Sequence, residues 1–151
     1  MKTDFLSIIH FAITVKDIHE TAEFYRDNFG FEIGNYRENV CQEEYGQITG
    51  MENALLKIVN ITGFGAVIEL VQYVDPKSEE IDLSTNNIGV AHICFQVQNI
   101  HELYDELKSK GIDFVWKEPV YVDGGVDDGC YAVYGKDLNG FTLEFYQAPE
   151  K

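Results

Sequence analysis

The chain has 151 residues, of which 45% are hydrophobic and 25% charged, and its formal net charge is −15 at pH 7. This charge argues against nucleic acid and anionic membranes as partners, since phosphate binding requires clustered lysine and arginine. The apolar content suffices for a packed core, and no apolar run approaches the roughly 20 residues of a membrane span. Three cysteines without CxxC spacing indicate a reducing, cytoplasmic setting with no disulfides and no structural zinc site.

The first half of the chain predicts a strand, a helix and three further strands. Alternating apolar residues favour a strand over 8–15. Asp17 is a suitable N-cap for a helix that ends at Gly30. A polar loop is expected over 41–53, and further strands are expected over 31–40, 54–61 and 66–74.

The second half repeats this order. A strand is expected over 92–97, and Asn99 is placed to cap a helix that runs to about Ser109. A glycine-containing loop at 123–129 separates the strands that follow. These strands are expected over 114–122, 130–134 and 141–147.

An internal repeat underlies the similarity of the two halves. The windows 10–20 and 92–102 share His, Val, Ile, His and Glu in register, and Asp17 is matched by Asn99. Such a repeat indicates a duplicated structural module. We therefore expect one domain over residues 1–151, composed of two modules at about 5–74 and 88–148 with a linker at about 75–87.

Four polar residues interrupt apolar strands at equivalent points of the repeat: His10, Glu69, His92 and Glu144. A single glutamate in a strand usually faces solvent, so the prediction depends on the matched positions. Two imidazoles and two carboxylates provide four ligands for a divalent metal, and an octahedral ion would keep two positions for water or substrate oxygens. The ligand set is compatible with Ni, Co, Mn, Zn or Fe and does not choose among them.

The chain resembles the vicinal oxygen chelate superfamily, which includes glyoxalase I, methylmalonyl-CoA epimerase, extradiol dioxygenases and antibiotic-resistance proteins. The resemblance is carried by His-x-x-x-x-Val-x-Asp at 10–17, by the helix end Phe-Tyr-Arg-Asp-Asn-Phe-Gly-Phe at 24–31, and by the turn Lys-Asp-Leu-Asn-Gly at 136–140. It extends from about residue 8 to 147. Leu138 stands where the family pattern often has proline.

The resemblance implies an α+β fold in which two tandem βαβββ modules form a curled mixed sheet around a metal-binding cleft. The family's ligand positions correspond to His10, Glu69, His92 and Glu144. A four-ligand set is more similar to glyoxalase I and the epimerases than to dioxygenases, which use two histidines and one carboxylate. The implied function is a metal-dependent isomerase, epimerase or lyase that acts through an enolate of a small substrate with vicinal oxygens. The alternatives are an extradiol-type ring-cleaving dioxygenase and a small-molecule binding or resistance protein.

Glyoxalase-like enzymes use a ligand carboxylate as the base, so the resemblance implies Glu144 or Glu69 as the catalytic residue. Glu44, in the predicted loop, is a further candidate, although a solvated acidic loop is the simpler interpretation. The resemblance also implies a homodimer. The candidates for lining the substrate site are Tyr45, Lys57, Tyr73, Tyr134 and Tyr146, with Lys57 holding an anionic group.

Overall fold

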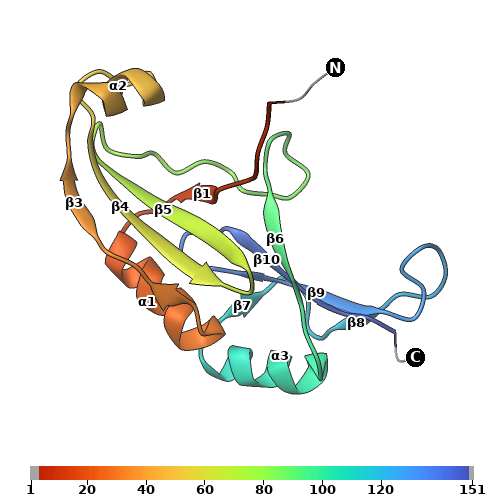
Figure 1. Cartoon of the computed structure of the whole chain (residues 1–151). Helices are drawn as coiled ribbons and strands as arrows, with labels where there is room; N and C mark the ends of the chain where they lie inside the picture. The colour runs from red at the N-terminus through yellow and green to blue at the C-terminus, as the bar shows by residue number, and fades with distance from the viewer. Residues whose placement is uncertain (1–3, 150–151) are drawn as a thin grey trace. The chain divides into compact units, whose positions relative to one another are not determined.

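Hydrogen bonding separates the strands into two mixed sheets of five strands each, one in each half of the chain (Figure 1). The computed structural model describes residues 4–149, and the chain divides into two units, Met1–Glu80 and Ile81–Lys151. The predicted α+β class with two tandem modules is confirmed, and each module forms its own mixed sheet. The boundary between the units falls inside the predicted linker. None of the helices within residues 4–149 is long and apolar enough to cross a bilayer.

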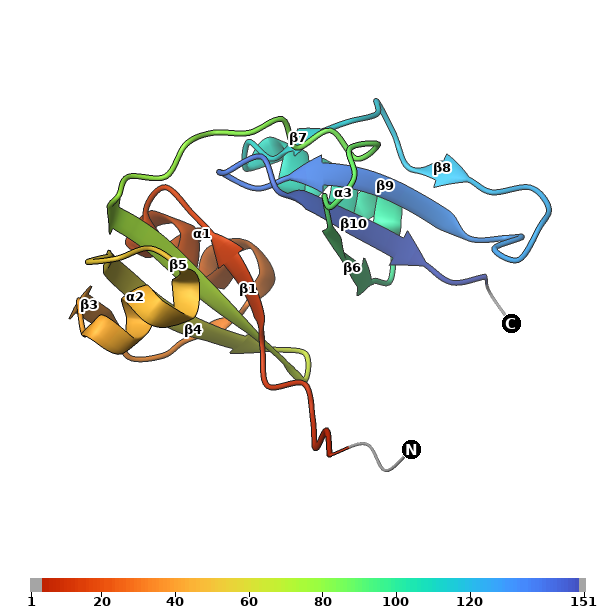
Figure 2. The same cartoon turned by 90° about the horizontal axis from the view of Figure 1, so that it is seen from above.

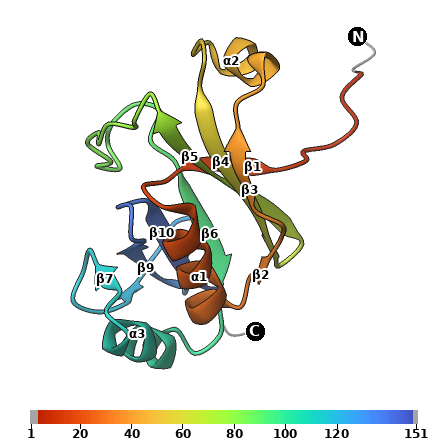
Figure 3. The ribbon, with the colours of Figure 1, turned by 90° about the vertical axis from the view of Figure 1, so that its left-hand side faces the viewer.

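The first unit has the strand order β1-β5-β4-β2, with β3 also paired to β4. Strands β1 and β5 are parallel, and β4 forms an antiparallel hairpin with β5. Figure 3 shows α1 beside this hairpin and α2 at its far end. The elements are β1 (Phe11–Thr14), α1 (Ile18–Phe29), β2 (Glu32–Ile33), β3 (Arg37–Val40), α2 (Glu43–Thr49), β4 (Leu55–Gly63) and β5 (Ala66–Asp75).

The second unit has the same topology without a counterpart of α2. Its strand order is β6-β10-β9-β7, with β8 also paired to β9. Strands β6 and β10 are parallel, and β9 is antiparallel to β10. Figure 2 shows α3 along one face of this sheet. The elements are β6 (His92–Gln96), α3 (Ile100–Ser109), β7 (Asp113–Phe114), β8 (Val120–Tyr121), β9 (Tyr131–Lys136) and β10 (Thr142–Gln147).

The repeat seen in the sequence extends to the pairing register. In the first unit Glu69 lies opposite Ala12, two residues after His10. In the second unit Glu144 lies opposite Cys94, two residues after His92. In both units the histidine lies two residues before the residue that is opposite the glutamate. The two His–Glu pairs are therefore equivalent in the fold.

A glutamine three residues after each glutamate ties the strand to the helix. The N–H of Ile18, the first residue of α1, donates to the side-chain oxygen of Gln72 at 3.2 Å. The N–H of Ile100, the first residue of α3, donates to that of Gln147 at 2.7 Å. Each bond satisfies a helix N–H that has no partner within the helix. Because side chains alternate along a strand, each glutamine lies on the opposite face from its glutamate.

Each sheet buries one face against its helix. Helix α1 packs on β4 and β5, and α3 packs on β10. Residues on these helix-covered faces include Ile68, Leu70, Leu143 and Phe145, all of which are buried. We call the opposite faces the Glu69 face, which carries Glu69, Val71 and Tyr73, and the Glu144 face, which carries Thr142, Glu144 and Tyr146.

Five sequence predictions differ from the structure. Residues 41–53 contain helix α2 where a loop was expected. The strand predicted over 8–15 begins only at Phe11. The strands predicted over 31–40 and 114–122 are each divided in two. Gly34 lies in the first interruption, where a side chain would come within 2.9 Å of the Asn60 carbonyl oxygen. Pro119 lies in the second interruption. Asn99 precedes α3 but makes no side-chain capping bond.

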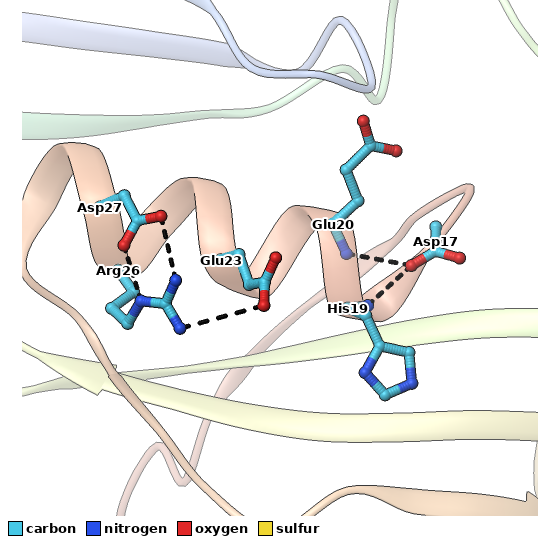
Figure 4. A network of polar contacts seen from close by, with 6 residues as sticks. All are labelled: Asp17, His19, Glu20, Glu23, Arg26 and Asp27. Atoms are coloured by element: carbon cyan, nitrogen blue, oxygen red, sulfur yellow. Dashed lines mark hydrogen bonds and ion pairs between the residues drawn. The ribbon is translucent and has the colours of Figure 1, made fainter.

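The N-cap of α1 gives a prediction for stability and its dependence on pH. The backbone N–H of Glu20 lowers the pKa of Asp17 from its ordinary value of 3.8, and the N–H of His19 adds to this (Figure 4). Asp17→Ala should lower the free energy of unfolding by about 1 kcal/mol at pH 7. Because the folded-state pKa is lowered, the carboxylate's contribution is present above pH 3.8 and disappears as the pH falls through the folded value. Urea unfolding at pH 7 and at pH 3 measures both effects.

The matched control is Asn99→Gly, at the equivalent position of α3. Asn99 has a positive φ of 53° and makes no capping bond, so glycine removes no interaction and suits the backbone. A loss of stability for Asn99→Gly as large as for Asp17→Ala, or the same loss for Asp17→Ala at both pH values, would contradict the capping role.

Candidate functional site

His10 and Glu69 lie together on the first unit. Nε2 of His10 is 3.6 Å from Oε1 of Glu69, and the Glu69 side chain is only 18% exposed. Its other oxygen, Oε2, accepts a hydrogen bond from Nη2 of Arg37 at 3.1 Å. A mostly buried carboxylate requires such partners, because desolvation without them is unfavourable.

Arg37 is a site residue that the sequence reasoning missed. It lies on β3 opposite Ile58, which in turn lies opposite Val71, so Arg37 belongs to the Glu69 face. Its Nη1 donates to the hydroxyl of Tyr45 at 3.2 Å. The one available signal was an arginine inside a predicted strand, in a chain with only two arginines.

Tyr45 and Tyr73 both lie on the Glu69 face of the first unit. Tyr73 is four residues after Glu69 on the same face of β5, and Tyr45 reaches this face from α2. Both tyrosines pack, with Val71, against a buried apolar cluster. The cluster consists of Val40, Ala54, Leu56 and Ile58.

Lys57 does not belong to this group, and the sequence prediction for it is corrected. It lies opposite Gln72 on the helix-covered face, where the side chain cannot point to the same side as Glu69. Its Nζ forms an ion pair with Oε2 of Glu38 at 3.3 Å. The other oxygen of Glu38 is 2.7 Å from Nε2 of His19, at the start of α1.

His92 and Glu144 form the corresponding pair of the second unit. Nε2 of His92 is 3.1 Å from Oε2 of Glu144, whose side chain is 19% exposed. Tyr134 lies directly opposite Glu144, and its ring centroid is 5.4 Å from that of His92. Burial raises the pKa of Tyr134 above 10.0, and the charge of Glu144 adds to this. The Tyr134 hydroxyl therefore stays protonated at neutral pH and is a hydrogen-bond donor beside the pair.

Cys94 also neighbours Glu144. Although Cys94 is exposed, desolvation by the surrounding atoms and the charge of Glu144 raise the pKa of its thiol to about 11. A thiol in this state is not a nucleophile at neutral pH, because the thiolate is the reactive form.

Glu144 and Tyr146 line one pocket of about 390 Å³ on the second unit. Burial, followed by the influence of Cys130 and Asp127, raises the pKa of the Tyr146 hydroxyl. Asp127, from the 123–129 loop, lines the same pocket. The other residues that line the pocket are Cys94, Val122, Cys130 and Ala132.

Lys136 is a cation on the Glu144 face of the second unit. Thr142 lies between His92 and Lys136 in register, so all three share the Glu144 face. Nζ of Lys136 donates to Oγ1 of Thr142 at 2.7 Å and to the carbonyl of Leu83 at 3.4 Å. Sequence reasoning missed this residue because it assigned Lys136 to the turn before the last strand.

The chain that carries these two equivalent His–Glu pairs can be compared with proteins of known family. The family model for the Glyoxalase/Bleomycin resistance protein/Dioxygenase superfamily matches residues 7–145. The chain belongs to this superfamily. The resemblance expected from the sequence motifs is thereby confirmed.

Relatives within the superfamily include two kinds of enzyme. The chain is 29% identical over 148 residues to "Lactoylglutathione lyase GLX1" of Arabidopsis thaliana, covering 97% of this chain and 46% of that protein. It is 25% identical over 138 residues to "Methylmalonyl-CoA epimerase, mitochondrial" of Dictyostelium discoideum, covering 89% of this chain and 74% of that protein. The chain thus spans about half the length of the lyase relative.

The fold agrees with a solved structure of a glyoxalase family protein from Bacillus cereus. The two have a TM-score of 0.81 and 19% sequence identity, over 99% of this chain and 98% of the other. At this identity the likeness shows the fold alone.

Superfamily members typically depend on a divalent metal ion. An imidazole and a carboxylate are both suitable ligand groups for such an ion, and of the two pairs His92–Glu144 has the closer ligand-like spacing. Ligand atoms at adjacent positions of an octahedral ion, each about 2.1 Å from it, are about 3.0 Å apart. The separation is 3.1 Å for His92–Glu144 and 3.6 Å for His10–Glu69. Among residues 4–149 no group of three or more His, Cys, Asp or Glu side chains that could hold a metal is present. Each unit thus carries one His–Glu pair.

Proposed function

We propose that the chain is a metal-dependent isomerase, epimerase or lyase of the glyoxalase type, with His10, Glu69, His92 and Glu144 as ligands of one divalent ion. The observation that supports this most is the equivalence of the two His–Glu pairs in strand register. When bound, the ion supplies Lewis-acid chemistry, which stabilises the negative charge that develops when a carbon next to a carbonyl loses its proton.

In this proposal the protein's own groups position the substrate and transfer the proton. Glu144, or alternatively Glu69, removes the proton and returns it to the carbon or its neighbour. The protonated hydroxyl of Tyr134 donates a hydrogen bond to a substrate oxygen. Lys136, on the same face as Glu144, holds an anionic group of the substrate. Tyr45, Tyr73 and Tyr146 line the rest of the site. Superfamily members often form dimers, and we propose a homodimer here as well.

Solvent exchange tests this reaction class. The metal-loaded protein, incubated in D₂O with a panel of α-hydroxy carbonyl compounds and thioesters, should introduce deuterium next to a carbonyl of at least one compound. Proton NMR follows the loss of the carbon-bound proton, and the metal-free protein is the control.

Two other results would each replace the proposal with a defined alternative. Oxygen consumption with a catechol, and no exchange with any compound, would identify a ring-cleaving dioxygenase. Saturable binding of a compound that persists after metal removal, without turnover or exchange, would identify a binding or resistance protein.

A further inference from the structure

The two glutamates have different environments, although their positions are equivalent. Glu69 accepts a hydrogen bond from a guanidinium at 3.1 Å. Within residues 4–149, no lysine or arginine nitrogen lies within 4.0 Å of Glu144, and its ion-pair partner is His92. The two units repeat the same arrangement in other respects, so this difference between the partners of Glu69 and Glu144 requires a physical reason.

We propose that Arg37 is a positioning residue that fixes Glu69 as a single-oxygen metal ligand. This inference rests on the proposed function. Arg37 occupies Oε2 of Glu69, while Oε1 faces Nε2 of His10. With Oε2 held, only Oε1 is available beside the histidine, and the carboxylate cannot turn to offer both oxygens. Hydrogen bonds to ligating carboxylates orient them in this way in metal sites generally.

Arg37 is itself held by Tyr45. Its Nη1 donates to the Tyr45 hydroxyl while Nη2 donates to Glu69, so the planar guanidinium spans both acceptors. Tyr45 is anchored in turn, because its ring packs on the buried cluster of Val40, Ala54, Leu56 and Ile58 and its carbonyl accepts from the Thr49 hydroxyl at 2.8 Å. The guanidinium therefore has a fixed position between two fixed partners.

This arrangement explains the helix that only the first unit has. Helix α2 is the insertion that brings Tyr45 to Arg37, and the second unit has no helix between β8 and β9. Lys136 is the cation of the Glu144 face, but it donates to Thr142 and Leu83. The partners of Glu144 are instead His92 at 3.1 Å and the Cys94 thiol. The structure thus assigns a guanidinium-held carboxylate to the first unit, whereas the carboxylate of the second unit contacts an imidazole and a thiol.

A guanidinium near a bound cation also has an unfavourable Coulomb interaction with it. The two effects differ in sign: if positioning dominates, removing Arg37 weakens metal binding, whereas if repulsion dominates, removing it strengthens metal binding. Metal affinity therefore decides between them without reference to enzymatic activity.

The experiment is a titration of the metal-free full chain with Co²⁺, followed by calorimetry and by visible absorption, which reports the coordination number of the ion. Arg37→Gln should bind Co²⁺ about 10- to 100-fold more weakly than the unmodified chain, with a changed absorption spectrum. Arg37→Lys keeps the charge but not the planar fork, and it should recover only part of the affinity. Tyr45→Phe, which leaves Arg37 in place, should weaken binding by a smaller factor and shift the spectrum in the same direction.

Arg26→Gln is the matched control, because it removes the same charge from the chain's other arginine, which is paired with Asp27 on α1. Its affinity should stay within about twofold of the unmodified chain, since exposed charges are screened by salt. Unmodified affinity and spectrum in both Arg37→Gln and Tyr45→Phe, or tighter binding in Arg37→Gln, would overturn the inference while leaving the proposed function intact. If the unmodified chain binds no Co²⁺, the proposed function and this inference fail together.

Discussion

Glu144→Gln should lower the rate of metal-dependent solvent exchange by about 10²- to 10⁴-fold, the usual contribution of a positioned general base. Glutamine has nearly the shape of glutamate and keeps an oxygen beside His92, but its amide cannot accept the substrate proton. The fold should be unaffected, because the side chain lies on the Glu144 face and not among the buried residues between the sheet and α3. The rate of deuterium incorporation at saturating metal and substrate measures the effect.

Two comparisons make this result specific. Glu79→Gln, an exposed glutamate of the linker, removes the same charge and should leave the rate unchanged. Glu69→Gln should lower the rate mainly through weaker metal binding, and excess metal should restore much of it. A rate for Glu144→Gln within a few-fold of the unmodified enzyme would exclude Glu144 as the base and favour Glu69.

The assignment of the four metal ligands is tested separately, by measuring how much metal variants of these residues contain. Protein carrying both His10→Ala and Glu144→Ala, purified without added metal, should contain far less metal than the unmodified chain. His101→Ala is the control, because this histidine also repeats in the sequence but lies on α3, with its ring against Tyr131. Equal metal content in the double variant and the unmodified chain would exclude the proposed ligands.

The second large effect concerns stability. Leu70→Ala and Leu143→Ala should each lower the free energy of unfolding by about 2–5 kcal/mol, the range for truncating a fully buried leucine. Both side chains are completely inaccessible to solvent, on the helix-covered faces of β5 and β10. Because the chain divides into two units, amide exchange should accelerate mainly within Met1–Glu80 for Leu70→Ala, and mainly within Ile81–Lys151 for Leu143→Ala.

Hydrogen exchange followed by mass spectrometry, with chemical denaturation, tests both parts of this prediction. Leu138→Ala is a suitable control, because this leucine is exposed in the turn before β10, and such changes usually alter stability by less than about 0.5 kcal/mol. If either core substitution accelerated amide exchange equally in both units, the units would unfold together. Their stabilities would then not be independent of each other.

The parts of the structure that were predictable from the sequence are those specified by nearby residues. Asp17 and Gly30 begin and end α1 as expected, because a capping carboxylate and a left-handed glycine act within one helical turn. The hairpin of β4 and β5 and the final strand follow from alternating hydrophobicity and turn residues. The repeat singled out His10, Glu69, His92 and Glu144, but their arrangement as one His–Glu pair in each unit is seen only in the structure.

The parts that sequence reasoning missed depend on pairing between distant residues. Arg37 and Glu69 are 32 residues apart, and only the register of β3, β4 and β5 places them on one face. The same register places Lys57 on the other face, which no local pattern indicates. Helix α2 was missed because it is one short helix with two glycines close by and no side-chain N-cap, so its propensity resembles that of a loop.

The bond between each helix start and a strand glutamine has a consequence for how the chain tolerates genetic change. Glu69 and Gln72 come from one stretch of β5 and point to opposite sides, as do Glu144 and Gln147 in β10. A substitution alters only one of the two roles. A deletion or insertion of a single codon between them leaves one side chain in place and moves the other to the wrong side. A change of length in these two short segments should therefore be more disruptive than a single substitution, because it removes one of the two side chains from its face.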